Sequence, residues 1–134
     1  MQDMVETTRY TFVSSVNNTV EKTMSKQKQK GTAAETAVVN WLVSKGRKHV
    51  ERRTLNGVKD RGDINGIIGV VIEVKNHQRM ALSEWVDELV VEIGNDNASS
   101  GVVIHKRKGT TDVGKWYATM PVDVWLKLVE EAGY

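Results

Sequence analysis

Residues 62–77 read GDINGIIGVVIEVKNH, and this stretch decides the fold. Its second half is rich in β-branched residues: Val70, Val71, Ile72 and Val74. Such a run predicts a strand over residues 69–76 that is buried on at least one side. The same run carries Glu73 and Lys75, two charges that are unfavourable to bury unless they are paired or bind a metal ion.

Side chains alternate along a strand, so Glu73 and Lys75 share one face while Ile72 and Val74 share the other. The simplest interpretation of the charged face is a salt bridge on a half-exposed strand. Such a bridge contributes about 0–1 kcal/mol and carries no function. Two acids elsewhere in the chain argue against this interpretation.

The first acid is Asp63, within a second predicted strand over residues 62–66. If the chain turns near Ile68, Asp63 lies opposite Glu73 on the neighbouring strand, close enough to share a cation. Hard oxygen ligands without a nearby His or Cys favour Mg²⁺ or Mn²⁺ over zinc. The dipeptide Asn65-Gly66 favours a tighter hairpin, which would put Asp63 opposite Ile68 and remove the site. We expect the wider turn, because it leaves both strands long enough to pair.

The second acid is Glu35, near the start of a helix predicted to run from Thr32 to about residue 45, before Gly46. Thr32 and Glu35 have the spacing of a capping box, and that structural role alone explains a glutamate here. Glu35 also lies at the start of an apolar stripe that must face the sheet, namely Val38, Val39 and Leu42. A carboxylate on an inward-facing stripe predicts a catalytic or metal-linked role.

The remaining elements complete an α/β pattern. Further strands are predicted over residues 49–55, 101–106 and 116–120, with an amphipathic helix over 82–93 and a final helix after Pro121. The tryptophans on helical apolar stripes, Trp41, Trp85 and Trp125, are expected in the core, as are Val124 and Leu128. The order α-β-β-β-α-β-β-α predicts a mixed β-sheet flanked by helices on both faces.

Residues 1–30 fit this pattern poorly, because they are polar and end in the low-complexity run SKQKQK. They predict a weakly ordered N-terminal extension, with a short strand over residues 9–13, ahead of one domain over residues 31–134. Met24 is an alternative start, since MSKQKQKG leads directly into the first clear helix.

The 134-residue chain contains no cysteine, which excludes disulfides and thiolate zinc sites. Nothing resembles a signal peptide or an apolar run of the ~20 residues that span a bilayer, so we expect a soluble cytoplasmic protein without a membrane partner. The net charge is +2, yet six Lys and Arg fall within residues 46–61, HKRK occupies 105–108, and five acids fall within 84–96. This segregation indicates a surface for a polyanion, although solvated loops without a partner explain it equally well.

Together, KGTAAE (30–35), GD (62–63) and IEVK (72–75), with a basic strand and loop between them, resemble the PD-(D/E)XK nuclease superfamily. More narrowly, they resemble the archaeal-type and phage-encoded Holliday junction resolvases, over about residues 30–107. The resemblance implies a restriction-endonuclease-like core, a divalent metal, and DNA hydrolysis that leaves 5′-phosphate and 3′-hydroxyl ends. Gly62 stands where the family has its namesake proline, and we expect it to permit the same kink.

The resemblance also implies roles by position. Asp63, Glu73 and the backbone carbonyl of Val74 would bind Mg²⁺ or Mn²⁺; Lys75 would be the motif lysine and Glu35 the helical acid. A carboxylate-held metal activates water and stabilises charge on the phosphate, and a neighbouring lysine adds to that stabilisation. The residues expected to neutralise DNA phosphates are Lys30, Arg52, Arg53, Lys59, Arg61, Lys106 and Arg107. Weaker candidates for phosphate contact or proton transfer are His77 and His105.

The sequence therefore predicts a Mg²⁺-dependent endodeoxyribonuclease. The most specific hypothesis is a Holliday junction resolvase that acts as a homodimer on four-way DNA junctions in recombination and repair, inside a bacterial host cell if it is phage-encoded. The alternatives are a restriction-like or repair endonuclease on other DNA structures, and an inactive nucleic-acid-binding module with the same fold. The intact set Asp63, Glu73 and Lys75 argues against the inactive module, because decayed sites tend to lose a ligand.

Overall fold

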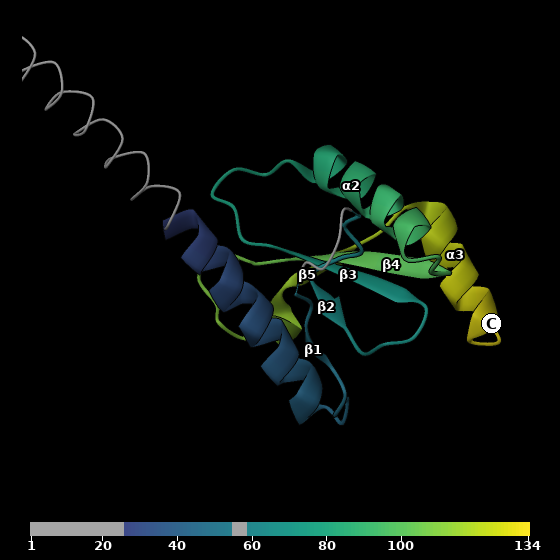
Figure 1. Ribbon diagram of the computed structural model, residues 1–134, viewed down its shortest axis with the longest axis horizontal. Helices are drawn as coiled ribbons and strands as arrows, with labels where there is room; N and C mark the ends of the chain where they lie inside the picture. The colour runs from purple at the N-terminus through teal and green to yellow at the C-terminus, as the bar shows by residue number, and fades with distance from the viewer. Residues whose placement is uncertain (1–25, 55–58) are drawn as a thin grey trace, which may run out of the picture. The chain divides into compact units, whose positions relative to one another are not determined.

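The computed structural model describes residues 26–54 and 59–134 (Figure 1). The chain divides into two compact units, Met1–Thr32 and Ala33–Tyr134. The predicted weakly ordered extension over residues 1–30, with its strand over 9–13, lies outside the described residues except for 26–30, which are helical and exposed.

The described residues form three α-helices and one five-stranded sheet, in the order predicted from the sequence. The first helix covers residues 26–44. It is followed by β1 (Glu51–Arg52), β2 (Ile64–Asn65), β3 (Val70–Lys75), α2 (Leu82–Asn95), β4 (Ser100–His105), the 3₁₀ turn η1 (Val113–Lys115), β5 (Tyr117–Thr119) and α3 (Val122–Glu131). None of the helices in these ranges is long and apolar enough to cross a membrane.

The sheet is open and mixed, with the strand order β1-β2-β3-β4-β5. Strands β3 and β4 are parallel and the other neighbouring pairs are antiparallel. Parallel neighbours need a long crossover connection, and α2 provides it between β3 and β4. The predicted mixed α/β architecture is thus confirmed, although β1 and β2 pair over only two residues each and are shorter than expected.

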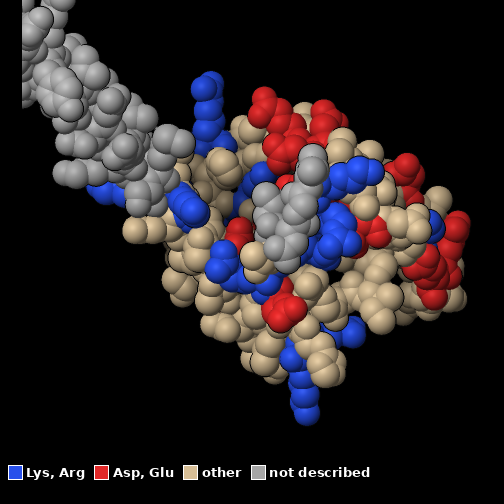
Figure 2. All heavy atoms as spheres, viewed as in Figure 1, with Lys and Arg blue, Asp and Glu red and all other residues tan. Residues whose placement is uncertain are grey.

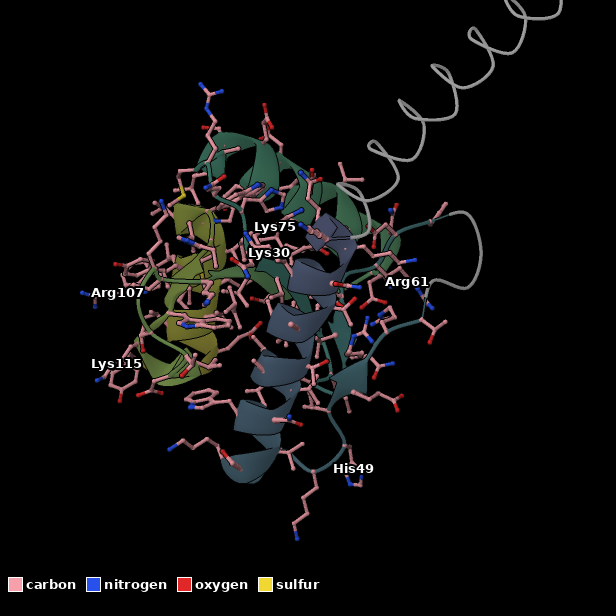
Figure 3. The ribbon with its side chains drawn as sticks, turned by 90° about the vertical axis from the view of Figure 1, so that its left-hand side faces the viewer. Lys30, His49, Arg61, Lys75, Arg107 and Lys115 are labelled. Atoms are coloured by element: carbon pink, nitrogen blue, oxygen red, sulfur yellow. The ribbon has the colours of Figure 1, made fainter. Side chains whose placement is uncertain are left out.

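The sheet buries a separate apolar cluster on each face. On one face, Ile72 and Val74 of β3 pack with Ala34 and Val38 of the first helix. On the other face, Val71 of β3 packs with residues of α2 and β4, namely Trp85, Leu89 and Val103. Helical residues 33–44 and α2 therefore cover opposite faces of the central strand (Figures 1 and 3).

The connection between β2 and β3 is the wide turn. Ile64 pairs with Ile72, which excludes the tight hairpin at Asn65-Gly66. Gly66 has φ +110°, and a Cβ there would collide with the backbone of His49 and Val50. The glycine is therefore required by the close approach of the segment before β1, and this explains an Asn-Gly pair that does not form a two-residue turn.

The predicted capping box is wrong. Thr32 lies inside the helix, because residues 26–31 are already helical. The Lys and Gln residues of this low-complexity run have high helix propensity and extend the helix toward the N-terminus. Capping therefore does not explain the carboxylate of Glu35.

The prediction for the tryptophans is correct for Trp85 but wrong for Trp125. Trp85 is buried and Trp41 packs half-buried against the first apolar cluster. Trp125 is 53% exposed, while Val124 and Leu128 on the same helix are half-buried. Since α3 lies at the side of the sheet and packs beside β4, only one of its two apolar stripes is covered.

Candidate metal centre

The strand register brings Asp63 and Glu73 together. Because Ile64 pairs with Ile72 in an antiparallel ladder, Asp63 lies opposite Glu73, as predicted. Asp63 Oδ2 accepts a hydrogen bond from the Val74 N–H at 2.8 Å. The Asp63 carboxylate thus takes the place of the backbone acceptor that β2 would otherwise supply.

Gly62 makes this arrangement possible, but not as a substitute for proline. Its φ is +101°, and a Cβ on it would lie 2.8 Å from Val71 Cγ1. Proline fixes φ near −65°, so it cannot adopt this conformation. The expectation that Gly62 permits the family's proline kink is therefore corrected: Gly62 has a left-handed backbone conformation and packs closely against Val71 and Ile72 of β3.

Two carboxyl groups are buried in contact with this region. Glu73 of β3 and Glu92 of α2 are each only 3% exposed. Glu73 Oε1 and Glu92 Oε2 have no hydrogen-bond partner among the described residues. Asp60, Glu73 and Glu92 each offer one oxygen atom, and these three atoms lie within 4.8 Å of one another. Asp63 does not belong to this group of three, although it is opposite Glu73.

Burial and mutual repulsion raise the pKa of each of these acids. Burial raises the pKa of Asp63 to about 6, against the hydrogen bond from Val74 and with help from the charge of Glu35. Burial, together with the charges of Asp63 and Glu92, raises the pKa of Glu73 far above its usual range. Burial likewise raises the pKa of Glu92. These are conditions under which a bound cation would be favourable.

Lys75 lies beside the acids and holds its charge. Its Nζ is 2.7 Å from Glu88 Oε2 and 3.5 Å from Glu73 Oε2. Burial lowers the pKa of Lys75, but the hydrogen bond to Glu88 and the charge of Glu73 outweigh it, so that the pKa rises. The ammonium therefore neutralises one side of Glu73 and leaves Oε1 unpartnered among the described residues.

Glu35 is held by an ion pair. Its Oε2 accepts a hydrogen bond from Arg52 Nε at 2.9 Å. Its charge is near enough to Asp63 to raise the pKa of that acid. Glu35 is thus placed beside the metal-ligand pair predicted from the sequence, on the first helix.

Sequence reasoning missed Asp60 and Glu92. Glu92 follows Leu89 by three residues and Trp85 by seven, which places it on the buried face of α2. The argument applied to Glu35, a carboxylate on an inward-facing stripe, would have found it. Asp60 lies in irregular chain, where no periodic pattern could reveal it.

The predicted DNA-binding residues are scattered, and several are already paired. Arg52 pairs with Glu35, while Nη1 of both Arg53 and Arg61 is 3.7 Å from Asp96 Oδ1. Arg53 and Lys106 are half-buried, and the other five are exposed: Lys30, Arg52, Lys59, Arg61 and Arg107. Figure 2 shows basic side chains in the middle of one face, flanked by acidic groups over α2 and α3.

The two histidines are placed differently. His105 is buried, its ring packs between Trp85 and Tyr117, and its Nε2 is 2.8 Å from Thr119 Oγ1. Burial lowers the pKa of His105, which favours the neutral form of this core histidine. His77 is exposed and its ring contacts Trp85.

Comparison with protein-family models, curated proteins and solved structures finds no match to this chain. The fold and the site define an α/β protein with a mixed sheet and a cluster of carboxyl groups at the end of its central strand.

Proposed function

We propose that the protein is a metal-dependent endodeoxyribonuclease of the PD-(D/E)XK type. The observation that carries this proposal is the alignment of Asp63 with Glu73 across β2 and β3, with Lys75 Nζ 3.5 Å from Glu73. The order of elements and the mixed sheet are those that the resemblance implies, which supports the restriction-endonuclease-like core.

The donor set fits a hard divalent cation. The donors of Asp63 and Glu73 are oxygen atoms, which Mg²⁺ and Mn²⁺ prefer, and Glu73 Oε1 is buried without a partner among the described residues. Asp63 and Glu73 would hold the ion. The Val74 N–H points toward Asp63, and since both polar groups of a strand residue face the same side, its carbonyl points there too. A bound Mg²⁺ supplies a Lewis acid and a water of lowered pKa.

Lys75 contributes a fixed positive charge. Its ammonium remains protonated at neutral pH and lies next to Glu73, where the charge of a phosphate would develop. A pre-oriented donor at that position stabilises the transition state more than the ground state. Glu88 holds the ammonium in place on the side away from the strand.

DNA is the polyanion that these residues would bind. In Figure 3, Arg61 and Arg107 lie on opposite sides of the molecule, and Lys75 lies between them. This arrangement supports a path for the DNA backbone from one basic segment to the other. Recognition by backbone charge predicts binding that weakens steeply with salt.

The specific substrate that we propose is the four-way junction, cut by a homodimer. A resolvase cuts two symmetric strands, residues 26–54 and 59–134 carry one carboxyl cluster, and a C2 dimer presents two. The pairing of two copies is supported by the exposed apolar stripe on α3, formed by Val122, Trp125 and Leu126. In this stripe the residues follow the i, i+3, i+4 spacing by which helices pack.

The test compares a synthetic four-way junction with a linear duplex of equal sequence, with and without Mg²⁺, alongside light scattering after size exclusion. We expect a dimer that binds the junction far more tightly and introduces paired, symmetric nicks. A monomer that cuts linear duplex equally well would rule out the resolvase and leave a general endonuclease. DNA binding without any cleavage would instead support the alternative of an inactive nucleic-acid-binding module.

A variant locates the dimer surface. Trp125→Glu puts a charge on the exposed stripe of α3 and should yield a monomer, with single nicks replacing paired ones. The matched control is Val90→Glu on α2, another exposed apolar position, which should remain dimeric. A dimeric Trp125→Glu protein would exclude α3 as the interface.

A further inference from the structure

Glu92 has no role in the site described so far. It lies on the buried face of α2, one turn after Leu89 and two turns after Trp85, where an apolar side chain would pack well. Its Oε2 is buried and has no partner among the described residues. A buried carboxyl oxygen without a partner is unfavourable, so Glu92 Oε2 points to a ligand.

The segment that carries Asp60 is tied to the C-terminal end of the same helix. Asn95 Nδ2 donates a hydrogen bond to the Asp60 carbonyl at 2.8 Å, and Arg61 pairs with Asp96. The Gly62 N–H donates to Asp60 Oδ1 at 3.0 Å, which orients the Asp60 carboxylate. The end of α2 therefore fixes both Glu92 and Asp60 toward Glu73.

We propose that Asp60, Glu73 and Glu92 form a divalent-cation site in which Glu92, from the crossover helix, is a ligand. This inference deepens the proposed function and rests on it for the choice of cation. The three oxygen atoms lie within 4.8 Å of one another. Oxygens on opposite sides of a Mg²⁺ ion are about 4.2 Å apart, so side-chain shifts below about 1 Å bring all three into contact with one ion.

The lysine of the site does not fill this position. Lys75 Nζ approaches Glu73 through Oε2 and binds Glu88 on its other side. Glu73 Oε1 remains for the cation, together with Glu92 Oε2. Asp63 Oδ2 accepts the hydrogen bond from the Val74 N–H. Glu73 therefore lies between Asp63 on β2 and Glu92 on α2, and it is the residue shared by the two groups of acids.

The experiment measures Mn²⁺ binding to the full chain by isothermal titration calorimetry, without DNA. We expect Glu92→Gln and Asp60→Asn each to weaken Mn²⁺ binding at least about tenfold. The matched control is Glu84→Gln, which removes an exposed carboxylate from the first turn of the same helix and should bind Mn²⁺ like the wild type. In EDTA, Glu92→Gln should melt at the same or a higher temperature, since it removes repulsion among buried acids, whereas a structural role would lower it.

Wild-type Mn²⁺ affinity in both Glu92→Gln and Asp60→Asn would overturn the inference, and so would a wild-type protein that binds no Mn²⁺. The nuclease proposal is judged separately by cleavage of DNA. If Mn²⁺ binds through Glu92 but no DNA is cut, the cation site is confirmed and the proposed nuclease activity is wrong. If DNA is cut but Glu92→Gln binds Mn²⁺ normally, the proposed nuclease activity is confirmed and the role of Glu92 as a ligand is wrong.

Discussion

The two faces of β3 bury side chains of opposite character. On the face toward helical residues 33–44, Ile72 and Val74 pack into an apolar cluster. On the face toward α2, Val71 joins a second apolar cluster, but Glu73 follows it and is just as deeply buried. Burial of the β3 face toward helical residues 33–44 therefore stabilises the fold without a ligand. Burial of the face toward α2 also buries a carboxyl group that lacks a full set of partners among the described residues.

This difference separates stability from function. Burial of apolar area is favourable without any ligand, whereas a buried carboxylate is favourable only with a proton, an ammonium or a cation beside it. Lys75 lies 3.5 Å from Glu73 Oε2, whereas Glu73 Oε1 and Glu92 Oε2 have no hydrogen-bond partner among the described residues. Substitutions on the two faces should consequently have opposite effects.

The largest effect is expected on the charged face. Asp63→Asn and Glu73→Gln should each reduce Mg²⁺-dependent cleavage about 10³-fold or more, because each removes a charge needed in the transition state. The melting temperature should stay unchanged or rise, since both variants relieve repulsion. Cleavage and thermal melting are measured together, with the exposed Glu51→Gln as control. Near-native turnover in either variant would remove the metal-site interpretation.

The apolar face should show the reverse. Ile72→Ala removes a fully buried side chain from the cluster under the first helix and should lower the free energy of unfolding by about 2–5 kcal/mol. Mn²⁺ affinity below the melting transition should be retained. The control is Ile68→Ala, at a fully exposed position, which should unfold like the wild type in urea. A loss of Mn²⁺ binding in folded Ile72→Ala protein would mean that the two faces are not independent.

The third effect is a dependence on pH. The pKa of Asp63 is raised to about 6 and that of Glu92 to about 7, above their values in an unfolded chain. The folded protein thus binds more protons than the unfolded chain between about pH 4 and 7, so its stability should fall as the pH rises through this range. Metal-free melting temperatures at pH 5 and 7.5 measure this fall, and Mn²⁺ should offset it at the higher pH. A metal-free profile that rises across this range would contradict the assignment.

The smallest effect on stability is expected at Glu35. Glu35→Gln loses a partly exposed ion pair with Arg52, and the free energy of unfolding should change by less than about 1 kcal/mol. If the acid acts at the site, cleavage should still fall about 10²-fold. Arg52→Gln breaks the same ion pair and serves as the control. A fully active Glu35→Gln protein would leave this glutamate with only its ion pair.

The sequence alone determined the order of the elements, the mixed sheet and the register of Asp63 against Glu73. These follow from local rules, because alternation fixes the face of each strand residue and the length of a turn fixes which residues pair. The wider turn was predicted against the Asn-Gly signal, and this Asn-Gly pair marks a close approach of backbone instead of a tight turn. The local rules failed at Thr32, which lies inside a helix instead of at its end.

Only the tertiary structure placed Glu92 and Asp60 beside Glu73 and left Trp125 exposed. The pattern of α2 shows that Glu92 points inward, but it cannot show which part of β3 lies beneath it. The crossover helix returns along β3, so that Glu88 meets Lys75 and, one turn later, Glu92 meets Glu73. Periodicity gives the face that each element buries, while the position of one element along another is set by packing between residues far apart in the chain, and no local pattern records it.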